Sequence, residues 1–169
     1  IIYTGYRDTL TVGGSSPMFT DIQSAVDALV STGVCGPTFV KIRPGVYSEQ
    51  VLIRAIPGSS TTNMVTFISS TNDSSDVTIN FSANISNNYT VRFNNASNIV
   101  FKHITIEAVN TTYANAVSII GSAVNLSFSN CHFIGISSSS SSSNYYTLYR
   151  NISASNDVTQ QIHFNQCRI

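Results

Sequence analysis

The sequence predicts an all-β protein, a right-handed parallel β-helix with three strands per coil, about four coils and an N-terminal capping α-helix. Three observations support this fold: a repeated apolar pattern in the second half of the chain, one amphipathic helix near its start, and no β-hairpin turn residues inside the repeat. The 169 residues can bury a single core, so we expect one domain. Residues 1–36 would form a lead-in and the cap helix, and residues 37–169 the coils.

A nine-residue pattern occurs at 98–106, 125–133 and 161–169. Its apolar spacing of two, three and two predicts two short alternating strands joined at a one-residue bend. The apolar columns are Ile99/Leu126/Ile162, Phe101/Phe128/Phe164, Ile104/Cys131/Cys167 and Ile106/Phe133/Ile169, and an amide column is Asn98/Asn125/Gln161. Copies that cannot bury an apolar face alone are expected to stack as coils, each with a third strand ahead of it, at 90–93, 116–119 and 146–150. We expect the amides to bond each other and the backbone, although a ligand-binding stripe is the alternative.

The rest of the chain follows in order. Residues 3–12 are a polar, alternating lead-in, and a turn follows at 13–17. Residues 20–23 have the form of a capping box with Thr20 as N-cap, and an apolar stripe at helical spacing then runs to Gly33. We expect this helix to cover the first coil. Turns at 35–37 and 44–45 flank a strand at 38–43, and further strands are expected at 51–53, 64–67 and 77–81. The serine run 137–143 predicts a loop between two coils.

Composition narrows the function. Charged residues are only 9% of the chain and the net charge is zero, which argues against nucleic acid as a partner. No apolar run approaches the roughly 20 residues that span a bilayer, so membrane insertion is not expected. A surface rich in Ser, Thr and Asn, with eight Asn-x-Ser/Thr triplets, favours an extracellular or cell-surface location. A chain this rich in those residues also makes such triplets by chance.

Two segments resemble a known superfamily. Phe19-Thr-Asp-Ile-Gln-Ser-Ala-Val-Asp27, followed by Ile42-Arg-Pro-Gly-Val-Tyr-Ser-Glu49, resembles the opening of pectin methylesterase and pectin lyase-like β-helix proteins, where a capping helix precedes a strand and a Pro-Gly-x-Tyr-x-Glu turn. More loosely, the whole chain is similar to β-helix segments of large bacterial cell-surface proteins of the adhesin type. The family's catalytic motifs, of the types Gln-Ala-Val-Ala and Asp-Phe-Ile-Phe-Gly, do not occur here. The resemblance therefore implies the fold and not the esterase activity, and Glu49 belongs to its structural turn.

The acids, histidines and cysteines of the sequence do not indicate a catalytic or metal-binding site. No two of the eight acids, at 8, 21, 27, 49, 73, 76, 107 and 157, are expected in one column of adjacent coils, so no general acid and base pair is indicated and no catalytic residue is assigned. The histidines at 103, 132 and 163 fall in different columns, so no metal site or other cofactor is expected. Cys131 and Cys167 share an inward column with Cβ atoms about 4.8 Å apart, which favours free buried thiols over a disulfide.

Tyr145, Tyr146 and Tyr149 would offer a flat aromatic surface on which a sugar stacks; the alternative is that they are strand residues half buried under a loop. The leading hypothesis is a non-catalytic segment of a secreted or cell-surface protein, serving as an adhesin, stalk or structural filament element. The alternative is a carbohydrate-active enzyme or carbohydrate-binding module of the pectin lyase-like group. A polysaccharide or cell-surface glycan is the expected partner. The last copy of the repeat has no cap, so further coils or another chain are expected to cover that end, as in a fragment of a longer chain.

Overall fold

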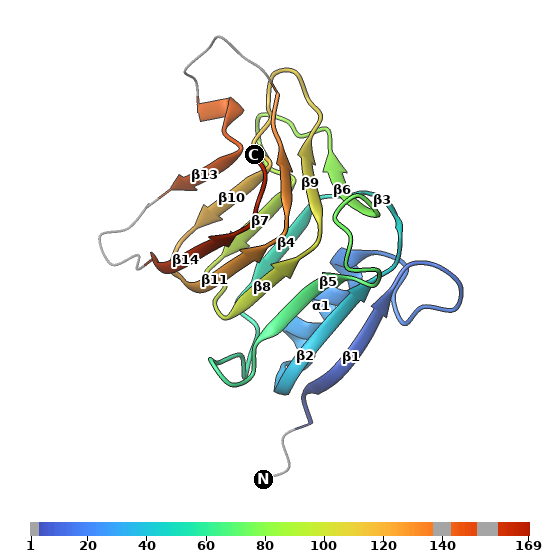
Figure 1. The fold of residues 1–169 in the computed structure, drawn as a ribbon. Coiled ribbons are helices and arrows are strands. Elements are labelled where there is room, and N and C mark those ends of the chain that lie inside the picture. The colour runs from blue at the N-terminus through green and yellow to red at the C-terminus, as the bar shows by residue number, and fades with distance from the viewer. Residues whose placement is uncertain (1–3, 137–142, 152–158) are drawn as a thin grey trace.

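Three parallel sheets form the molecule, and the computed structural model describes them over residues 4–136, 143–151 and 159–169 (Figure 1). Sheet A has the order β1 (Tyr6–Val12), β2 (Val34–Ile42), β5 (Val65–Ser69), β8 (Ile99–Lys102), β11 (Ala123–Ser129) and β14 (Thr159–Asn165). Sheet B contains β3 (Gly45–Ser48), β6 (Val77–Phe81), β9 (Thr105–Ala108) and β12 (His132–Ile134). Sheet C contains β4 (Val51–Arg54), β7 (Val91–Asn94), β10 (Val117–Ile120) and β13 (Leu148–Asn151).

The chain passes through sheets A, B and C in turn and then returns to sheet A, so each coil has three strands. The first coil is β2, β3 and β4, and the fourth is β11, β12 and β13. Strands β1 and β14 each add one more strand to sheet A, beyond the first and fourth coils respectively. The predicted parallel β-helix is therefore confirmed, with four complete coils as expected.

The repeat aligns in space as it does in sequence. Ile99 and Phe101 of β8 pair with Leu126 and Phe128 of β11, and Ile106 of β9 pairs with Phe133 of β12. The bend between the two strands of each copy is a single residue with positive φ: His103 at 53°, Asn130 at 51° and Gln166 at 52°. This left-handed conformation turns the chain without a hairpin.

The amide column has a structural role. Asn98, Asn125 and Gln161 have φ values of 60°, 57° and 61°, in the left-handed region that asparagine tolerates better than most residues. The Asn125 side chain donates through Nδ2 to Asn98 Oδ1 at 3.1 Å. The expectation that these amides bond each other is thus confirmed for the first pair.

Phenylalanines stack through the core along the helix axis. Phe67 and Phe101 stack with ring centroids 4.9 Å apart, and Phe101 and Phe128 follow at 5.9 Å. Phe164 of β14 continues the column at 5.2 Å from Phe128, but 42% of its surface is exposed because β14 is the edge strand of sheet A. The expectation that further coils or another chain cover this end stays a prediction.

The N-terminal region differs from the expectation. The supposed lead-in contains β1, which pairs in parallel with β2, so the sheets begin well before residue 37. Residues 35–37 are not a turn but lie within β2. Between the pairs Tyr6–Val34 and Asp8–Thr38, β2 advances by four residues and β1 by only two. This irregularity is a bulge, which is one of the few places in a sheet that accept a proline such as Pro37. The expected turn at 44–45 is also shorter, because Gly45 already begins β3.

The predicted cap helix is α1 (Ile22–Thr32), and its buried residues Ile22, Ala25, Val26 and Leu29 are fully covered. Its N-cap is Asp21, whose side chain accepts from Ser24 N at 2.7 Å, and not Thr20, which donates its hydroxyl to Asp21. Gly33 ends the helix with φ 79°, as predicted. Within the described segments, no helix is long and apolar enough to cross a membrane. The predicted serine loop falls largely on residues 137–142, outside the described residues.

Candidate functional site

Chemistry in this fold has to lie on the outer faces of the sheets and at the corners between them, because the inward columns fill the core. The outward positions of the four coils are mostly polar or apolar, with four cations and one acid among them. In sheet A they are Phe39, Lys41, Thr66, Ile68, Val100, Lys102, Ser127 and Ser129; in sheet B, Val46, Ser48, Thr78, Asn80, Thr105, Glu107, His132 and Ile134; in sheet C, Leu52, Arg54, Arg92, Asn94, Ser118, Ile120 and Tyr149. Among these described positions Glu107 is the single carboxylate.

Two acids stabilise the start of α1. The Glu49 carboxylate accepts from Ile22 N at 2.9 Å and from Gln23 N at 2.8 Å, so it caps the helix from the turn that follows β3. Burial raises the pKa of Glu49 above its ordinary value, against the two N–H groups, which lower it. Burial also acts to raise the pKa of Asp21, but the bonds from Ser24 and Thr20 outweigh it and lower the value overall. The expectation that Glu49 is structural is confirmed.

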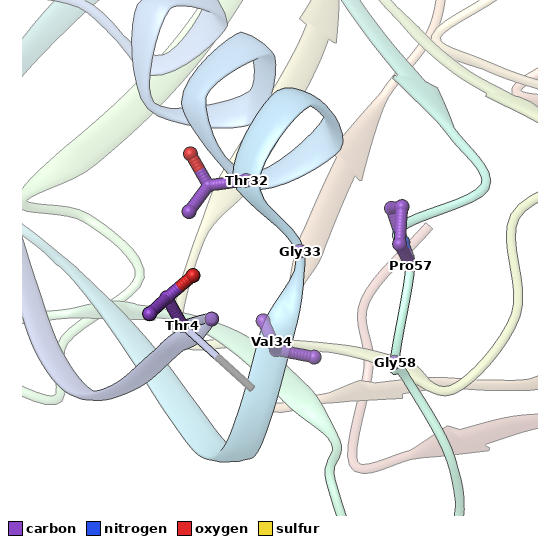
Figure 2. Close-up of a pocket in the computed structure, with 7 residues that line it drawn as sticks. Thr4, Thr32, Gly33, Val34, Pro57 and Gly58 are labelled. Carbon is purple, nitrogen blue, oxygen red and sulfur yellow. The ribbon is translucent and has the colours of Figure 1, made fainter. Parts of the chain in front are cut away.

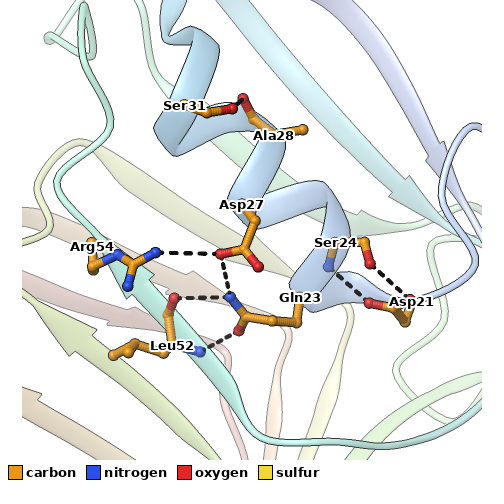
Figure 3. Close-up of polar contacts among 8 residues, drawn as sticks. All are labelled: Asp21, Gln23, Ser24, Asp27, Ala28, Ser31, Leu52 and Arg54. Atoms are coloured by element: carbon orange, nitrogen blue, oxygen red, sulfur yellow. Dashed lines mark hydrogen bonds and ion pairs between the residues drawn. The ribbon is translucent and has the colours of Figure 1, made fainter.

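Gln23 ties the same helix to the edge of sheet C (Figure 3). Its Oε1 accepts from Leu52 N at 2.7 Å and its Nε2 donates to Leu52 O at 3.4 Å and to Asp27 Oδ1 at 2.9 Å. Leu52 lies on β4, the edge strand of that sheet, so the glutamine amide takes the place of a neighbouring strand. Asp27 also pairs with Arg54 at 3.4 Å on the surface.

Asp73 serves a turn between β5 and β6. Its Oδ1 accepts from the N and Oγ of Ser75, both at 2.8 Å, and these bonds hold the pKa of the carboxyl below its ordinary value. Four acids, Asp21, Asp27, Glu49 and Asp73, thus have structural partners, and none of them faces another carboxylate across a cleft.

The histidines and cysteines do not form a reactive site. No group of three or more His, Cys, Asp or Glu side chains in the described part of the chain is placed to hold a metal ion. Cys131 and Cys167 are free thiols in the same column, and each donates through Sγ to a carbonyl of the coil before it, that of Phe101 or Phe128. Burial raises the pKa of Cys131 to about 12, which makes it unreactive at neutral pH. Cys131 is buried as expected, but Cys167 is only partly buried.

A cavity of about 320 Å³ lies at the C-terminal end of α1 (Figure 2). Its lining is backbone and small side chains, including Gly33, Val34, Pro57 and Gly58. No titratable side chain lines it, so it offers shape without the convergent polar groups that mark a binding site.

A smaller hollow, of about 160 Å³, lies at the corner between sheets B and C. The segments 82–90 and 109–116, which join these sheets, and residues 143–147 before β13 lie on the same side of the molecule, at the top of Figure 1. The hollow is lined by Ile85, Ser86, Asn88, Arg92, Asn115, Asn144 and Tyr149. We call it the Arg92 groove.

Asparagines hold the wall of the Arg92 groove. Asn88 accepts through Oδ1 from Asn115 N at 3.1 Å and donates through Nδ2 to Asn144 O at 3.2 Å. Asn115 in turn accepts from Tyr146 N at 2.7 Å. These bonds link three successive coils, so the groove is a built feature and not an accident of loose loops.

The structure separates the three tyrosines proposed for sugar contact. Tyr145 lies in the short 3₁₀-helix η1 (Ser143–Tyr145) and packs against the core. Tyr146 and Tyr149 stack with ring centroids 6.0 Å apart and an interplanar angle of 8°, and Tyr146 is 44% exposed. Tyr149 lines the Arg92 groove. The geometry leaves two of the three available for stacking.

Arg92 was not singled out by the sequence. It lies on β7 in the outward column Leu52, Arg92, Ser118 and Tyr149. Its guanidinium carbon is 3.8 Å from the centre of the buried Tyr89 ring, and its Nε donates to Ser118 Oγ at 3.3 Å. The one available signal was the strand at 90–93, which places Arg92 between two inward residues and hence outward.

No protein-family model matches this sequence, and no curated protein matches it. Solved structures of pectin methylesterases resemble it. A pectin methylesterase from Aspergillus niger in deglycosylated form is 21% identical, with a TM-score of 0.61 over 94% of this chain and 55% of that one. The rice weevil pectin methyl esterase is 17% identical, with a TM-score of 0.64 over 94% of this chain and 49% of that one. The chain spans about half the length of these proteins, and at such identities it shares with them the parallel β-helix fold.

Proposed function

We propose that this chain is a non-catalytic β-helix segment of a secreted or cell-surface protein, where it serves as an adhesin, stalk or structural filament element. One observation carries the proposal: Glu107 is the single carboxylate on the described outward positions of the four coils. Glycoside hydrolysis and related acid–base chemistry need two groups facing one substrate. A lone carboxylate on sheet B supplies only one.

The distribution of the other polar groups supports the same function. Four of the acids cap α1, pair at its surface or close a turn. Many of the outward positions instead carry Ser, Thr or Asn, which keep the surface hydrated without adding charge. A rigid rod with such a surface suits a stalk or an adhesin.

Incubation of the purified chain with methyl-esterified and de-esterified pectin-like polymers tests the proposal. Released methanol, new reducing ends and unsaturated sugar products are measured, with an active pectin methylesterase as the positive control. We expect no turnover above a heat-inactivated sample. Sustained release of any of the three products would contradict a non-catalytic role and favour the carbohydrate-active enzyme.

Carbohydrate binding is the second candidate, and the stacked Tyr146 and Tyr149 favour it. Parallel aromatic rings beside a polar groove are suited to contact with the apolar face of a sugar. Tyr146→Ala should weaken retention on insoluble polysaccharides. The matched control is Phe39→Ala, which removes an aromatic side chain of similar exposure, 41% against 44%, from the outer face of sheet A. Equal retention of both variants and the parent chain would contradict glycan contact at Tyr146.

A further inference from the structure

Arg92 is a half-buried cation, and no counter-charge pairs with it among the described residues. Within the described residues the one ion pair is Arg54–Asp27, and no carboxylate lies within ion-pair distance of Arg92. Burial lowers the pKa of its guanidinium, and the titratable groups that face it are the hydroxyls of Tyr89 and Tyr149. The guanidinium group stays charged at neutral pH despite such a shift. Its positive charge therefore lies at the groove with no paired carboxylate among the described residues.

The orientation of the guanidinium leaves one side for a ligand. One of its faces covers the Tyr89 ring, and its Nε is occupied by Ser118. Stacking and this bond fix the plane of the group, which reduces the entropy lost when a ligand binds. The terminal nitrogens have no hydrogen-bond partner among the residues that the structure describes, and they match two oxygens of a carboxylate or a sulfate in a paired arrangement.

The size and lining of the groove restrict the ligand further. About 160 Å³ is well below the 300–1,000 Å³ typical of pockets for drug-sized molecules, so one ring or one charged substituent fits. Tyr149 lies two strands from Arg92 in the same outward column, about 10 Å away at the usual strand spacing. A glycan chain that reaches both residues would cross the coils and place an acidic substituent at Arg92.

We propose that the Arg92 groove binds an anionic substituent, a carboxylate or a sulfate ester, of a glycan that stacks on the Tyr146 and Tyr149 pair. The inference rests on the second candidate function, glycan binding, and adds to it the chemical class of the ligand and the residue that selects it. Arg92 is a binding residue in this proposal and takes part in no bond-breaking step.

The test uses oligosaccharides of one length that carry no charge, one carboxylate per ring or one sulfate ester per ring. Affinity is measured by calorimetry with the full chain and with Arg92→Gln. The matched control is Arg54→Gln, which removes a cation from the same face of sheet C. Arg54 is the next outward residue of β4 after Leu52, the residue that pairs with Arg92, and its own partner is Asp27. Thermal unfolding of each variant establishes that it is folded.

We expect at least one anionic series to bind at least about tenfold tighter than the neutral series, because a charge-assisted hydrogen-bond pair contributes that much affinity. Arg92→Gln should remove this preference and Arg54→Gln should keep it. The series that binds identifies the group as carboxylate or sulfate. If Arg92→Gln does not fold, the salt dependence of the parent chain decides, because affinity for the anionic series alone should fall as salt rises.

Equal affinity for neutral and anionic oligosaccharides would overturn the inference while leaving glycan binding intact. An anionic preference that survives in Arg92→Gln would also overturn it, because the charge would then be read elsewhere. Absence of binding to all three series would overturn both the inference and the carbohydrate-binding candidate. The non-catalytic assignment is decided separately, by the turnover assay.

Discussion

Replacing Gln23 with alanine tests whether a side-chain amide secures the edge of sheet C. The substitution removes the acceptor of Leu52 N, at 2.7 Å, and the weaker donor to Leu52 O, at 3.4 Å. A hydrogen-bonding group left unpaired on a half-buried strand costs about 1–3 kcal/mol. Alanine recovers roughly 0.4 kcal/mol in helix propensity, so the net loss in the free energy of unfolding should be about 1–2 kcal/mol.

For a domain of this size that loss corresponds to a fall in Tm of roughly 3–6 °C. Denaturant unfolding followed by circular dichroism measures the loss in the free energy of unfolding. Ser31→Ala is the matched control on the same helix, because its exposed hydroxyl donates only to Ala28 O within the helix. We expect that control to lie within about 0.5 kcal/mol of the parent chain.

Gln23→Glu separates the two halves of the amide. A carboxylate can still accept from Leu52 N, but it cannot donate to Leu52 O and it would face the Asp27 carboxylate. Its stability should therefore be restored in part when Asp27 is also changed to asparagine. If Gln23→Ala proves as neutral as Ser31→Ala, the edge strand does not depend on this amide and the reasoning is refuted.

Three further predictions concern the cap, the core and a thiol. Glu49→Ala should cost about 2–4 kcal/mol, because two N–H groups at the start of α1 lose their acceptor, and Glu49→Gln about half as much. Burial raises the pKa of Glu49 in the folded chain above its ordinary value of 4.5, so the folded state binds the proton more tightly than the unfolded state does. Stability should therefore fall as the pH rises from 4.5 through the pKa of the folded state. Glu49→Gln should lack this pH dependence in unfolding titrations. Phe101→Ala should cost about 3–5 kcal/mol in denaturant unfolding, against less than about 1 kcal/mol for the exposed Phe39→Ala, and similar losses for the two would count against the stacked core. Cys131, with its pKa raised to about 12, should resist alkylation at pH 8 in the native chain, and all three cysteines should react after denaturation without reductant; recovery of one thiol would reveal a disulfide.

The coils were predictable because their inward columns repeat. Phe101 and Phe128 are paired inward residues of neighbouring coils with their rings in contact, and the sequence repeats the same residue type at this place in each copy. The amides at 98 and 125 were predictable for a related reason, since this position in both copies has a left-handed backbone and a side-chain bond to the other copy. Such constraints are local to the repeat and can be read without knowing the rest of the structure.

The details that the sequence did not predict depend on contacts between distant residues. Thr20 and Asp21 are both good N-caps, and the choice of Asp21 accompanies the Glu49 carboxylate, which binds the N–H groups of Ile22 and Gln23 from 26 or 27 residues away. Because Glu49 accepts from these N–H groups, the Gln23 side chain does not take part in capping and instead accepts from Leu52 N of β4. The bulge at residues 35–37 likewise becomes visible only once β1 is paired with β2.

The Arg92 groove was missed for the same reason. Arg92 and Tyr149 are brought into one outward column by two intervening returns of the chain, and the segments that make those returns differ in length. The sequence could place Tyr149 near a loop, but it could not give the register that sets it in the column of Arg92. Outward residues also carry no repeated pattern, because the core does not constrain them.

The lengths of the corner segments indicate why recognition would be located there. Between sheets A and B the chain turns at 43–44, 103–104 and 130–131 in three of the four coils, whereas between sheets B and C it passes through 82–90, 109–116 and 135–147 in the last three. The short corners fix the coils, and the long ones also supply groups that line the groove, such as Asn88 and Asn115. Because the Arg92 groove draws its lining from the second, third and fourth coils, a ligand bound there depends on the stacking of all three. Core packing and recognition are therefore coupled: a core substitution such as Phe101→Ala, which loosens the third coil against its neighbours, should weaken binding at Arg92 although it touches no groove residue.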